Sequence, residues 1–253
     1  GHSRAILEVG PGVAVLGIEW DPVEFAEFKS QNPDLKLVAV NDSYINIKDI
    51  AGRYDFYPDD ILFDLGLSSW HYEQSGRGFS FAKDEYLDMR FNPESGEPDA
   101  STIVNTLRPD ELEEIIRIYG EEQFSRQIAE QIVKSRKAKA ITTTGELVEA
   151  ISQAAPEWYK HKKIHFATKT FQALRVYVNH ELENVEKGIR NAIDVLKPGG
   201  RLVVISFQGM EDKIVKNIFR EKAKEGAVKF VVKGTIKPSW EETKANPRAR
   251  SAK

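Results

Sequence analysis

The stretch ILEVGPGVAVLGIEWD, residues 6–21, decides the fold because it places a glycine turn between two apolar runs and ends in acids. A nucleotide-binding loop has a strand before its glycines, a helix after them, and a second strand that ends in an acid about 20 residues further on. Here Glu19 follows Gly12 by only seven residues. A crossover between parallel strands needs a longer connection than this. The turn is therefore predicted to end a helix over residues 3–8 and to lead into a strand over residues 13–19.

The glycine loop that would hold a nucleotide is accordingly expected upstream of Ser3, with Gly1 and His2 among its last residues. The alternative is that these first residues are the remnant of an expression tag.

The remaining pattern alternates between strands and helices, with a long helical section in its middle. Runs typical of strands cover residues 35–41, 61–66, 201–207 and 228–234. Helical spacing starts at Pro109, is ended or bent at Gly120, and resumes as a second stripe at Phe124. Thr143 and Glu146 have the spacing of a capping box, which predicts a third helix that stops near Pro156. Longer amphipathic patterns predict helices over residues 178–196 and 212–224.

This order predicts an α/β fold with a doubly wound sheet and an inserted all-helical domain. The expected domains are residues 1–100, the insertion 101–163, and residues 164–253. Ligands of such sheets bind beyond the carboxyl ends of the strands. The segments expected to converge on one crevice are Glu19, residues 42–44, 64–69 and 206–212.

Composition excludes several classes of site. The chain has no cysteine, which rules out disulfides, thiolate metal sites and a cysteine nucleophile. Its five histidines show no ligand spacing, so no metal is expected. No apolar run is long enough to cross a bilayer, and a cytoplasmic protein without membrane contact is predicted.

Positive charge gathers in two stretches although the net charge is -3. Such stretches can neutralise phosphates, and solvated helix faces are the equally weighted alternative. The first contains Lys134, Arg136, Lys137 and Lys139, and the second contains Lys160, Lys162, Lys163, Lys169 and Arg175.

Nine stretches in this order resemble one family: GHSRAIL, DLGLSS, RGFSF, LDMR, YGEEQFSRQIA, ITTTGEL, HFATKTFQALRVYVNHELE, LKPGGRLVVISF and NPRARSAK. With them the chain resembles the RsmH (MraW) family of S-adenosylmethionine-dependent 16S ribosomal RNA cytosine-N4 methyltransferases. The resemblance implies a class I, Rossmann-like methyltransferase domain with a helical insertion, and the small ribosomal subunit with its 16S RNA as partner. A homodimer is one alternative for the oligomeric state.

Family members begin earlier, with the first strand and the full glycine loop, and continue past Lys253 into a final strand. The chain is therefore expected to be truncated at both ends. Loss of the first strand would leave its neighbours with unpaired backbone groups. These 253 residues alone are expected to bind the cofactor weakly.

The resemblance assigns the cofactor, S-adenosylmethionine, to residues at the strand ends. Glu19 is expected to accept the ribose hydroxyls, where the family usually has Asp, and Tyr44 is expected to flank the adenine. A surface acid and edge packing are the respective alternatives. Asp64 is expected to accept hydrogen bonds from an amino group of the cofactor or the target. The predicted cofactor-binding residues are Gly1, His2, Glu19, Tyr44, Asp64 and His71, and the predicted catalytic residues are Asp64, Ser68, Ser206, Phe207 and Gln208.

A polar stripe of Thr168, Gln172, Arg175 and Asn179 is expected to shape the target pocket or, alternatively, to form a hydrogen-bond network between domains. A loop with Arg77, Phe79, Asp88 and Arg90 is expected to cover the crevice, where a flipped base stacks on Phe79. The predicted RNA-binding residues are Arg77, Phe79, Arg90, Lys169, Gln172, Arg175, Asn179, Arg248 and Arg250.

The chain departs from the family pattern near the predicted crevice. Trp70 and His71 stand where the family has Pro and Gln, and Gln208 and Gly209 stand where it has His and Ser. Glutamine cannot exchange a proton near neutral pH. A second hypothesis is therefore a catalytically weakened protein that binds RNA or assists ribosome assembly.

Overall fold

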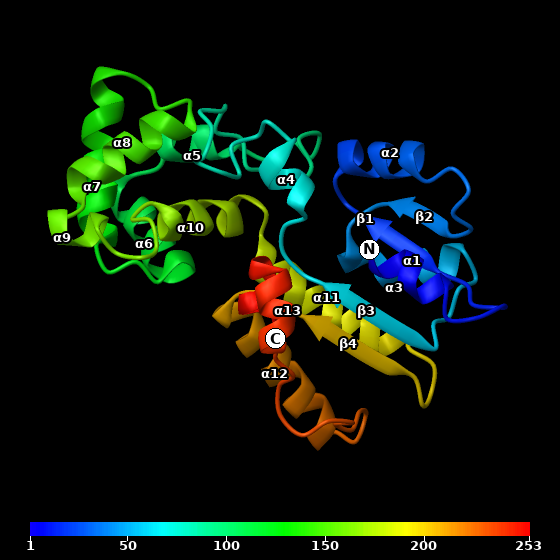
Figure 1. Cartoon of the computed structure of the whole chain (residues 1–253). Coiled ribbons are helices and arrows are strands. Elements are labelled where there is room, and N and C mark those ends of the chain that lie inside the picture. The colour runs from blue at the N-terminus through cyan, green and yellow to red at the C-terminus, as the bar shows by residue number, and fades with distance from the viewer. The chain divides into compact units, whose positions relative to one another are not determined.

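The computed structural model describes the whole chain, residues 1–253, which folds into two compact units (Figure 1). The first unit contains Gly1–Gly66 and Leu182–Lys253, and the second contains Leu67–Glu181. Each unit has its own cluster of buried apolar side chains. The predicted insertion, residues 101–163, lies within the second unit.

The first unit contains all the strands of this mixed α/β chain. Strand β1 (Leu16–Glu19) pairs in parallel with β2 (Val38–Asn41), and β3 (Asp60–Asp64) pairs in parallel with β4 (Arg201–Ile205). Each lies where a strand was predicted and is shorter than the predicted run. The pairs remain two separate two-stranded sheets, so the predicted single sheet is not continuous here.

Helices connect these strands and cover the β3–β4 pair. Helix α2 (Pro22–Gln31) joins β1 to β2, the short helices η1 (Tyr44–Asn46) and α3 (Ile47–Arg53) lead to β3, and α11 (Glu181–Val195) leads to β4. Ile61 and Phe63 of β3 point to the same face because strand side chains alternate, and they pack with Val185 and Ile189 of α11. Helix α12 (Gly209–Lys224) follows β4, and α13 (Trp240–Ala245) and η2 (Pro247–Ser251) end the unit.

The glycine turn of residues 10–12 follows a helix, as predicted. Helix α1 (His2–Leu7) precedes it and β1 follows. The helix ends three residues before Gly10, with Glu8 as its last cap in a right-handed helical conformation. Gly12 adopts a φ of +91°, which L-residues with a side chain rarely adopt. The turn is thus a connector between helix and strand, and Gly10 is not the residue that ends the helix.

The second unit is helical. Its elements are α4 (Ser69–Glu73), α5 (Ala100–Thr106), α6 (Pro109–Gly120), α7 (Ser125–Ala138), α8 (Thr144–Ala154), α9 (Glu157–Lys160) and α10 (Thr168–Val178). The predicted helix starts at Pro109 and Thr143 are confirmed. Fully buried Leu112, Ile128, Leu147 and Leu174 come from four of these helices and meet in one core.

Gly120 is the last residue of α6, and Glu121 after it takes a left-handed φ of +47° that ends the helix. A Cβ at Gly120 would lie 2.5 Å from the backbone oxygen of Lys169, a distance that real side chains do not reach. The predicted break at this glycine is confirmed, and the close approach of α10 explains why glycine is needed there.

One predicted helix is confirmed with a later start, and one predicted strand is wrong. The helix predicted over residues 178–196 is α11 (Glu181–Val195), which begins three residues later because α10 ends at Val178 and His180 takes a φ of +50°. The strand predicted over residues 228–234 is irregular, and its Phe230 and Val231 are exposed. An alternating apolar pattern forms a strand only when a neighbouring strand supplies hydrogen-bond partners.

The capping box of α8 provides a test of local stability. Thr143 Oγ1 accepts the Glu146 N–H, and Glu146 Oε2 accepts the N–H groups of Thr142 and Thr143. A hydrogen bond from Lys139, followed by that from Thr142, lowers the pKa of Glu146 from 4.5 to about 2. Because the folded-state pKa lies below the unfolded one, this stabilisation is present above about pH 4.5 and is lost as pH falls toward 2.

Glu146→Gln is therefore expected to lower the free energy of unfolding at pH 7, and the difference from the unmodified protein is expected to shrink between pH 4.5 and 2. Urea unfolding followed by far-UV circular dichroism measures this. Glu149→Gln, an exposed change on the same helix outside the cap, is the control. A pH-independent difference for Glu146→Gln would contradict the assigned role.

Candidate functional site

Glu19 lies at the carboxyl end of β1, and its pKa is raised toward neutral pH. Its Oε1 accepts the Asp21 N–H at 2.8 Å. Burial is the largest cause that raises its pKa to about 7; the Asp21 N–H opposes the rise, and the negative charges of Glu24 and Asp21 add to it. Additional hydrogen-bond donors would stabilise the ionised form of this half-buried carboxylate.

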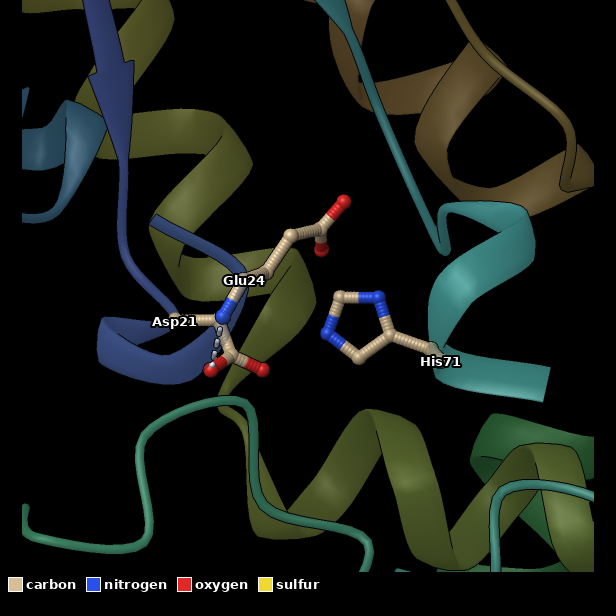
Figure 2. A group of neighbouring side chains, drawn as sticks. All are labelled: Asp21, Glu24 and His71. Atoms are coloured by element: carbon tan, nitrogen blue, oxygen red, sulfur yellow. Dashed lines mark hydrogen bonds between the residues drawn. The ribbon is translucent and has the colours of Figure 1, made fainter. Parts of the chain in front are cut away.

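Two more acids begin the helix that follows. Asp21 caps α2 by accepting the N–H groups of Val23 at 2.9 Å and Glu24 at 3.2 Å, and Figure 2 shows the second of these bonds. Pro22 occupies the first helical turn, where its missing N–H costs nothing. Asp21 is thus a helix cap, and Glu19 is the acid that ends the strand.

Tyr44 follows β2 and lies against the core of the first unit. Its ring meets Phe63 edge to face, with centroids 5.4 Å apart. A Cβ on Gly188 of α11 would lie 2.5 Å from Tyr44 Cδ2, so glycine at this place makes room for the ring. Edge packing, the alternative for Tyr44, is therefore present, while its expected contact with adenine stays a prediction.

Asp64 ends β3 and contacts one of the predicted cofactor residues. His2 Nδ1 lies 3.2 Å from Asp64 Oδ2. Burial raises the pKa of Asp64, and His2 opposes the rise through its charge and hydrogen bond. Gly1 directly precedes α1 as its N-cap residue. The structure thus brings His2 and Asp64 together within the first unit.

The segment after β4 is occupied by helix capping. Glu211, which is 1% exposed, accepts the N–H groups of Phe207 at 3.0 Å and Gln208 at 3.1 Å. Gln208 is the N-cap residue of α12, and its N–H is the one that Glu211 accepts there. Ser206 exchanges two backbone hydrogen bonds with Lys253. Gln208 is therefore used as a helix cap.

Arg248 and Arg250, predicted to contact RNA, lie on η2 and are exposed. Asn246 caps this turn by accepting the Arg248 N–H. Both arginines belong to the first unit, as do Ser206 and Lys253.

The predicted residues of the α4 region belong to the core of the second unit. Ser68 caps α4, and its Oγ lies 2.9 Å from His71 Nδ1. His71, also drawn in Figure 2, is 5% exposed and meets Phe79 and Phe91 edge to face. Phe79 is buried and stacked on Phe91 with centroids 5.6 Å apart. The expectation that Phe79 offers an open ring to a flipped base is therefore wrong.

Two arginines predicted to bind RNA hold the loop of residues 77–97 instead. Arg77 Nη1 donates to the backbone oxygens of Arg90 at 2.9 Å and Phe91 at 3.0 Å. The guanidinium of Arg90 makes a two-pronged pair with Asp88 and donates to the Glu97 oxygen. These hydrogen bonds of the two arginines are made within the second unit.

The polar stripe on α10 is also largely structural. Arg175 pairs with Glu181 through bonds of 2.6 and 2.8 Å, and both side chains are nearly buried. Asn179, 2% exposed, accepts the Phe91 N–H and donates to the Met89 oxygen. Lys169 donates to the Glu121 oxygen, while half-buried Gln172 lies on the same helix. Arg175 and Asn179 thus take part in a hydrogen-bond network, which was the alternative to a target pocket. This network lies within the second unit rather than between domains.

Two buried acids that bind predicted site residues were not singled out from the sequence. Glu181 and Glu211 are 5% and 1% exposed, yet neither was singled out. The spacing Gln208-x-x-Glu211 is that of a capping box, which was a usable signal. No comparable local pattern marks Glu181.

The Arg175–Glu181 pair allows the structural role to be tested. Arg175→Met leaves a buried carboxylate without its partner, and a loss of about 3–5 kcal/mol in the free energy of unfolding is expected. The double variant Arg175→Met with Glu181→Leu removes both charges and is expected to regain most of that loss. Denaturant unfolding of all four proteins of the double-mutant cycle measures the coupling. Additive effects would contradict a role in this ion pair.

Comparison with known proteins identifies the family. The chain matches the MraW methylase family over residues 1–253. It is 42% identical to the ribosomal RNA small subunit methyltransferase H of Leptospira interrogans over 258 aligned residues, which cover all of this chain and 77% of that protein. The corresponding proteins of Dehalococcoides mccartyi and Persephonella marina are 43% and 41% identical, with 76% and 87% of their lengths covered. None of the helices has the length and apolar character needed to span a membrane. The chain belongs to the MraW methylase family.

Proposed function

We propose that the protein transfers a methyl group from S-adenosylmethionine to the exocyclic N4 amine of a cytosine in the decoding region of 16S ribosomal RNA. The observation that carries this proposal is the family match over all 253 residues, together with relatives named ribosomal RNA small subunit methyltransferases. The small ribosomal subunit is accordingly the proposed partner.

The proposed reaction demands alignment more than acid–base chemistry. S-adenosylmethionine supplies a methyl carbon bonded to a positively charged sulfur. The amine nitrogen forms a bond to that carbon while the carbon–sulfur bond breaks, and the amine then releases a proton. Holding the reacting atoms in line and excluding water provide most of the acceleration in such displacements.

The residues of the first unit fit the proposed cofactor. The Glu19 carboxylate accepts the Asp21 N–H on Oε1 and burial raises its pKa, so further hydrogen-bond donors would stabilise its ionised form. Two ribose hydroxyls would supply them. Tyr44 would flank the adenine, Asp64 with His2 would receive the amino group, and Gly1 would border the methionine portion. No role for His71 follows from its place in the core of the second unit.

The finer fold is part of the same proposal: a class I, Rossmann-like methyltransferase domain with an inserted helical domain. Four parallel-paired strands joined through helices support the first part. A compact helical unit between β3 and β4 supports the second part.

The proposed contacts to RNA phosphates are narrowed by the structure. Arg248 and Arg250 are exposed and can approach phosphates. Gln172 remains a proposed pocket residue. Arg77, Arg90, Arg175 and Asn179 are bonded inside the second unit, so they are proposed to position the polypeptide that surrounds the target.

A catalytically weakened RNA-binding protein is the second candidate, and Gln208 favours it because its amide cannot exchange a proton near neutral pH. If the family histidine at this place accepts the amine proton, the present protein lacks that acceptor. The alternative is that water takes the proton, which becomes strongly acidic after attack. A large rate gain in Gln208→His with unchanged cofactor affinity would reject the water hypothesis.

The two candidates separate in one experiment. Undermethylated small subunits are incubated with the full-length protein and labelled S-adenosylmethionine, and the modified nucleoside is identified by mass spectrometry. Methyl transfer to the cytosine N4 position supports the proposed enzyme, with fully methylated subunits as the control. Cofactor and subunit binding without transfer would support the weakened protein.

The raised pKa of Glu19 predicts that cofactor affinity depends on pH. Ribose hydroxyls donate to the ionised carboxylate, so cofactor binding should release a proton from a group with a pKa of about 7. Affinity is therefore expected to rise from pH 6 to pH 8 by at most about tenfold. Isothermal titration calorimetry across this range measures it.

Glu19→Gln is expected to bind more weakly and to lose this component of the pH dependence. Glu24→Gln is the matched control, since it removes a neighbouring charge that raises the pKa of Glu19. That variant should keep the dependence with its midpoint at lower pH. An unchanged pH profile in Glu19→Gln would exclude the ribose role.

A further inference from the structure

The segment over residues 157–164 places aromatic and basic side chains on the surface of the second unit. It comprises α9 and the turn that follows it. Trp158 is 57% exposed and Ile164 is 60% exposed, more than any other large apolar side chain of that unit. Exposed tryptophans that the core does not need are a frequent mark of contact surfaces.

Trp158 is held in place although it is exposed. The neighbouring Tyr159 is 7% exposed, donates its hydroxyl to Glu122 at 2.6 Å, and meets the Phe124 ring with centroids 5.0 Å apart. Trp158 touches Phe124 and Tyr159 with centroids 5.8 Å away in each case. Tyr159 therefore anchors the segment, and the exposed Trp158 ring is held in place by its contacts with Tyr159 and Phe124.

Uncompensated positive charge lies next to this ring. Lys160 pairs with Glu157, whereas Lys162 and Lys163 form no ion pair. The Lys162 Nζ lies 4.8 Å from the centroid of the Trp158 ring. An exposed aromatic ring thus lies beside two lysines that form no ion pair, and the Lys162 ammonium contacts the rings of Trp158 and Tyr159.

Several other basic residues noted in the sequence are less available. In the second stretch, Lys169 caps a helix end and Arg175 pairs with Glu181. In the first stretch, Arg136 donates to the Val104 oxygen and Lys139 pairs with Glu146. Lys162 and Lys163 are therefore the strongest candidates of the second stretch for binding an external anion.

We propose that Trp158, Lys162 and Lys163 form a docking surface for unpaired nucleotides of the substrate RNA, outside the residues that hold the cofactor. A base stacks on the indole while neighbouring phosphates contact the two lysines, which is the chemistry of single-stranded nucleic-acid binding. The excess positive charge favours RNA over an apolar protein partner. The inference rests on the proposed function, because it takes RNA as the substrate.

The test is binding of a fluorescein-labelled, unstructured pyrimidine RNA of about ten nucleotides, followed by fluorescence anisotropy with the full-length protein. Trp158→Leu is expected to weaken binding by about 5-fold to 150-fold. Lys162→Gln with Lys163→Gln is expected to reduce the slope of log affinity against log salt by about 1.4, since two phosphate contacts are lost. Circular dichroism checks that each variant keeps its helices.

Tyr57→Leu is the control. Tyr57 is 53% exposed and lies before β3, where no RNA contact is proposed, so this variant is expected to leave RNA affinity unchanged. Equal losses in the two aromatic variants, or no loss in Trp158→Leu, would overturn the proposal. It is also overturned if Trp158→Leu keeps its RNA affinity but binds whole small subunits more weakly, because the surface would then dock protein.

Failure of this inference can be separated from failure of the proposed function. Methyl transfer to small subunits by the unmodified protein tests the function alone. Normal transfer with unchanged RNA binding in Trp158→Leu rejects only the docking surface. Absence of transfer by the unmodified protein rejects the function, whatever Trp158 does.

Discussion

The parallel pairing of β3 with β4 is the constraint on which the first unit depends. Asp64 lies opposite Ile205 in this register, although the whole second unit separates the two strands in the chain. Closing so long a connection costs conformational entropy, and burial of Ile61, Phe63 and their partners on α11 offsets it. Because the strands run in parallel, the pairing also places Asp64 beside the segment that begins at Ser206. The proposed chemistry therefore depends on a long-range contact rather than on any local motif.

The local part of this structure could be predicted from sequence. The short distance from Gly12 to Glu19 excluded a nucleotide loop, and the helix α1 before the turn and the strand β1 after it agree with that reading. Helix starts at Pro109 and Thr143 were readable because their caps act within a few residues. The same holds for the break at Gly120, although the close approach of Lys169 that requires glycine there could not be predicted.

Elements that depend on distant partners could not be predicted in the same way. The run over residues 228–234 has a strand pattern but no strand beside it. The break before α11 involves His180 at positive φ and Asn179, whose side chain bonds to Met89 and Phe91. For the candidate site, motif residues such as Arg77 and Arg90 looked like RNA contacts, whereas their partners inside the unit became visible only in three dimensions. Charge alone does not distinguish an arginine that contacts phosphate from one in an internal ion pair. Only the structure shows which arginines already have partners inside the protein.

Hydrogen–deuterium exchange of the full-length protein, with and without S-adenosylmethionine, tests most directly where the cofactor binds. The expected result is added protection of backbone amides at the carboxyl ends of β1 and β3, around Asp21 and Leu65, with helices α6, α7 and α8 unchanged. Protection confined to the second unit, or bound cofactor without protection around Glu19 and Asp64, would contradict the assignment of the cofactor to the strand ends of the first unit.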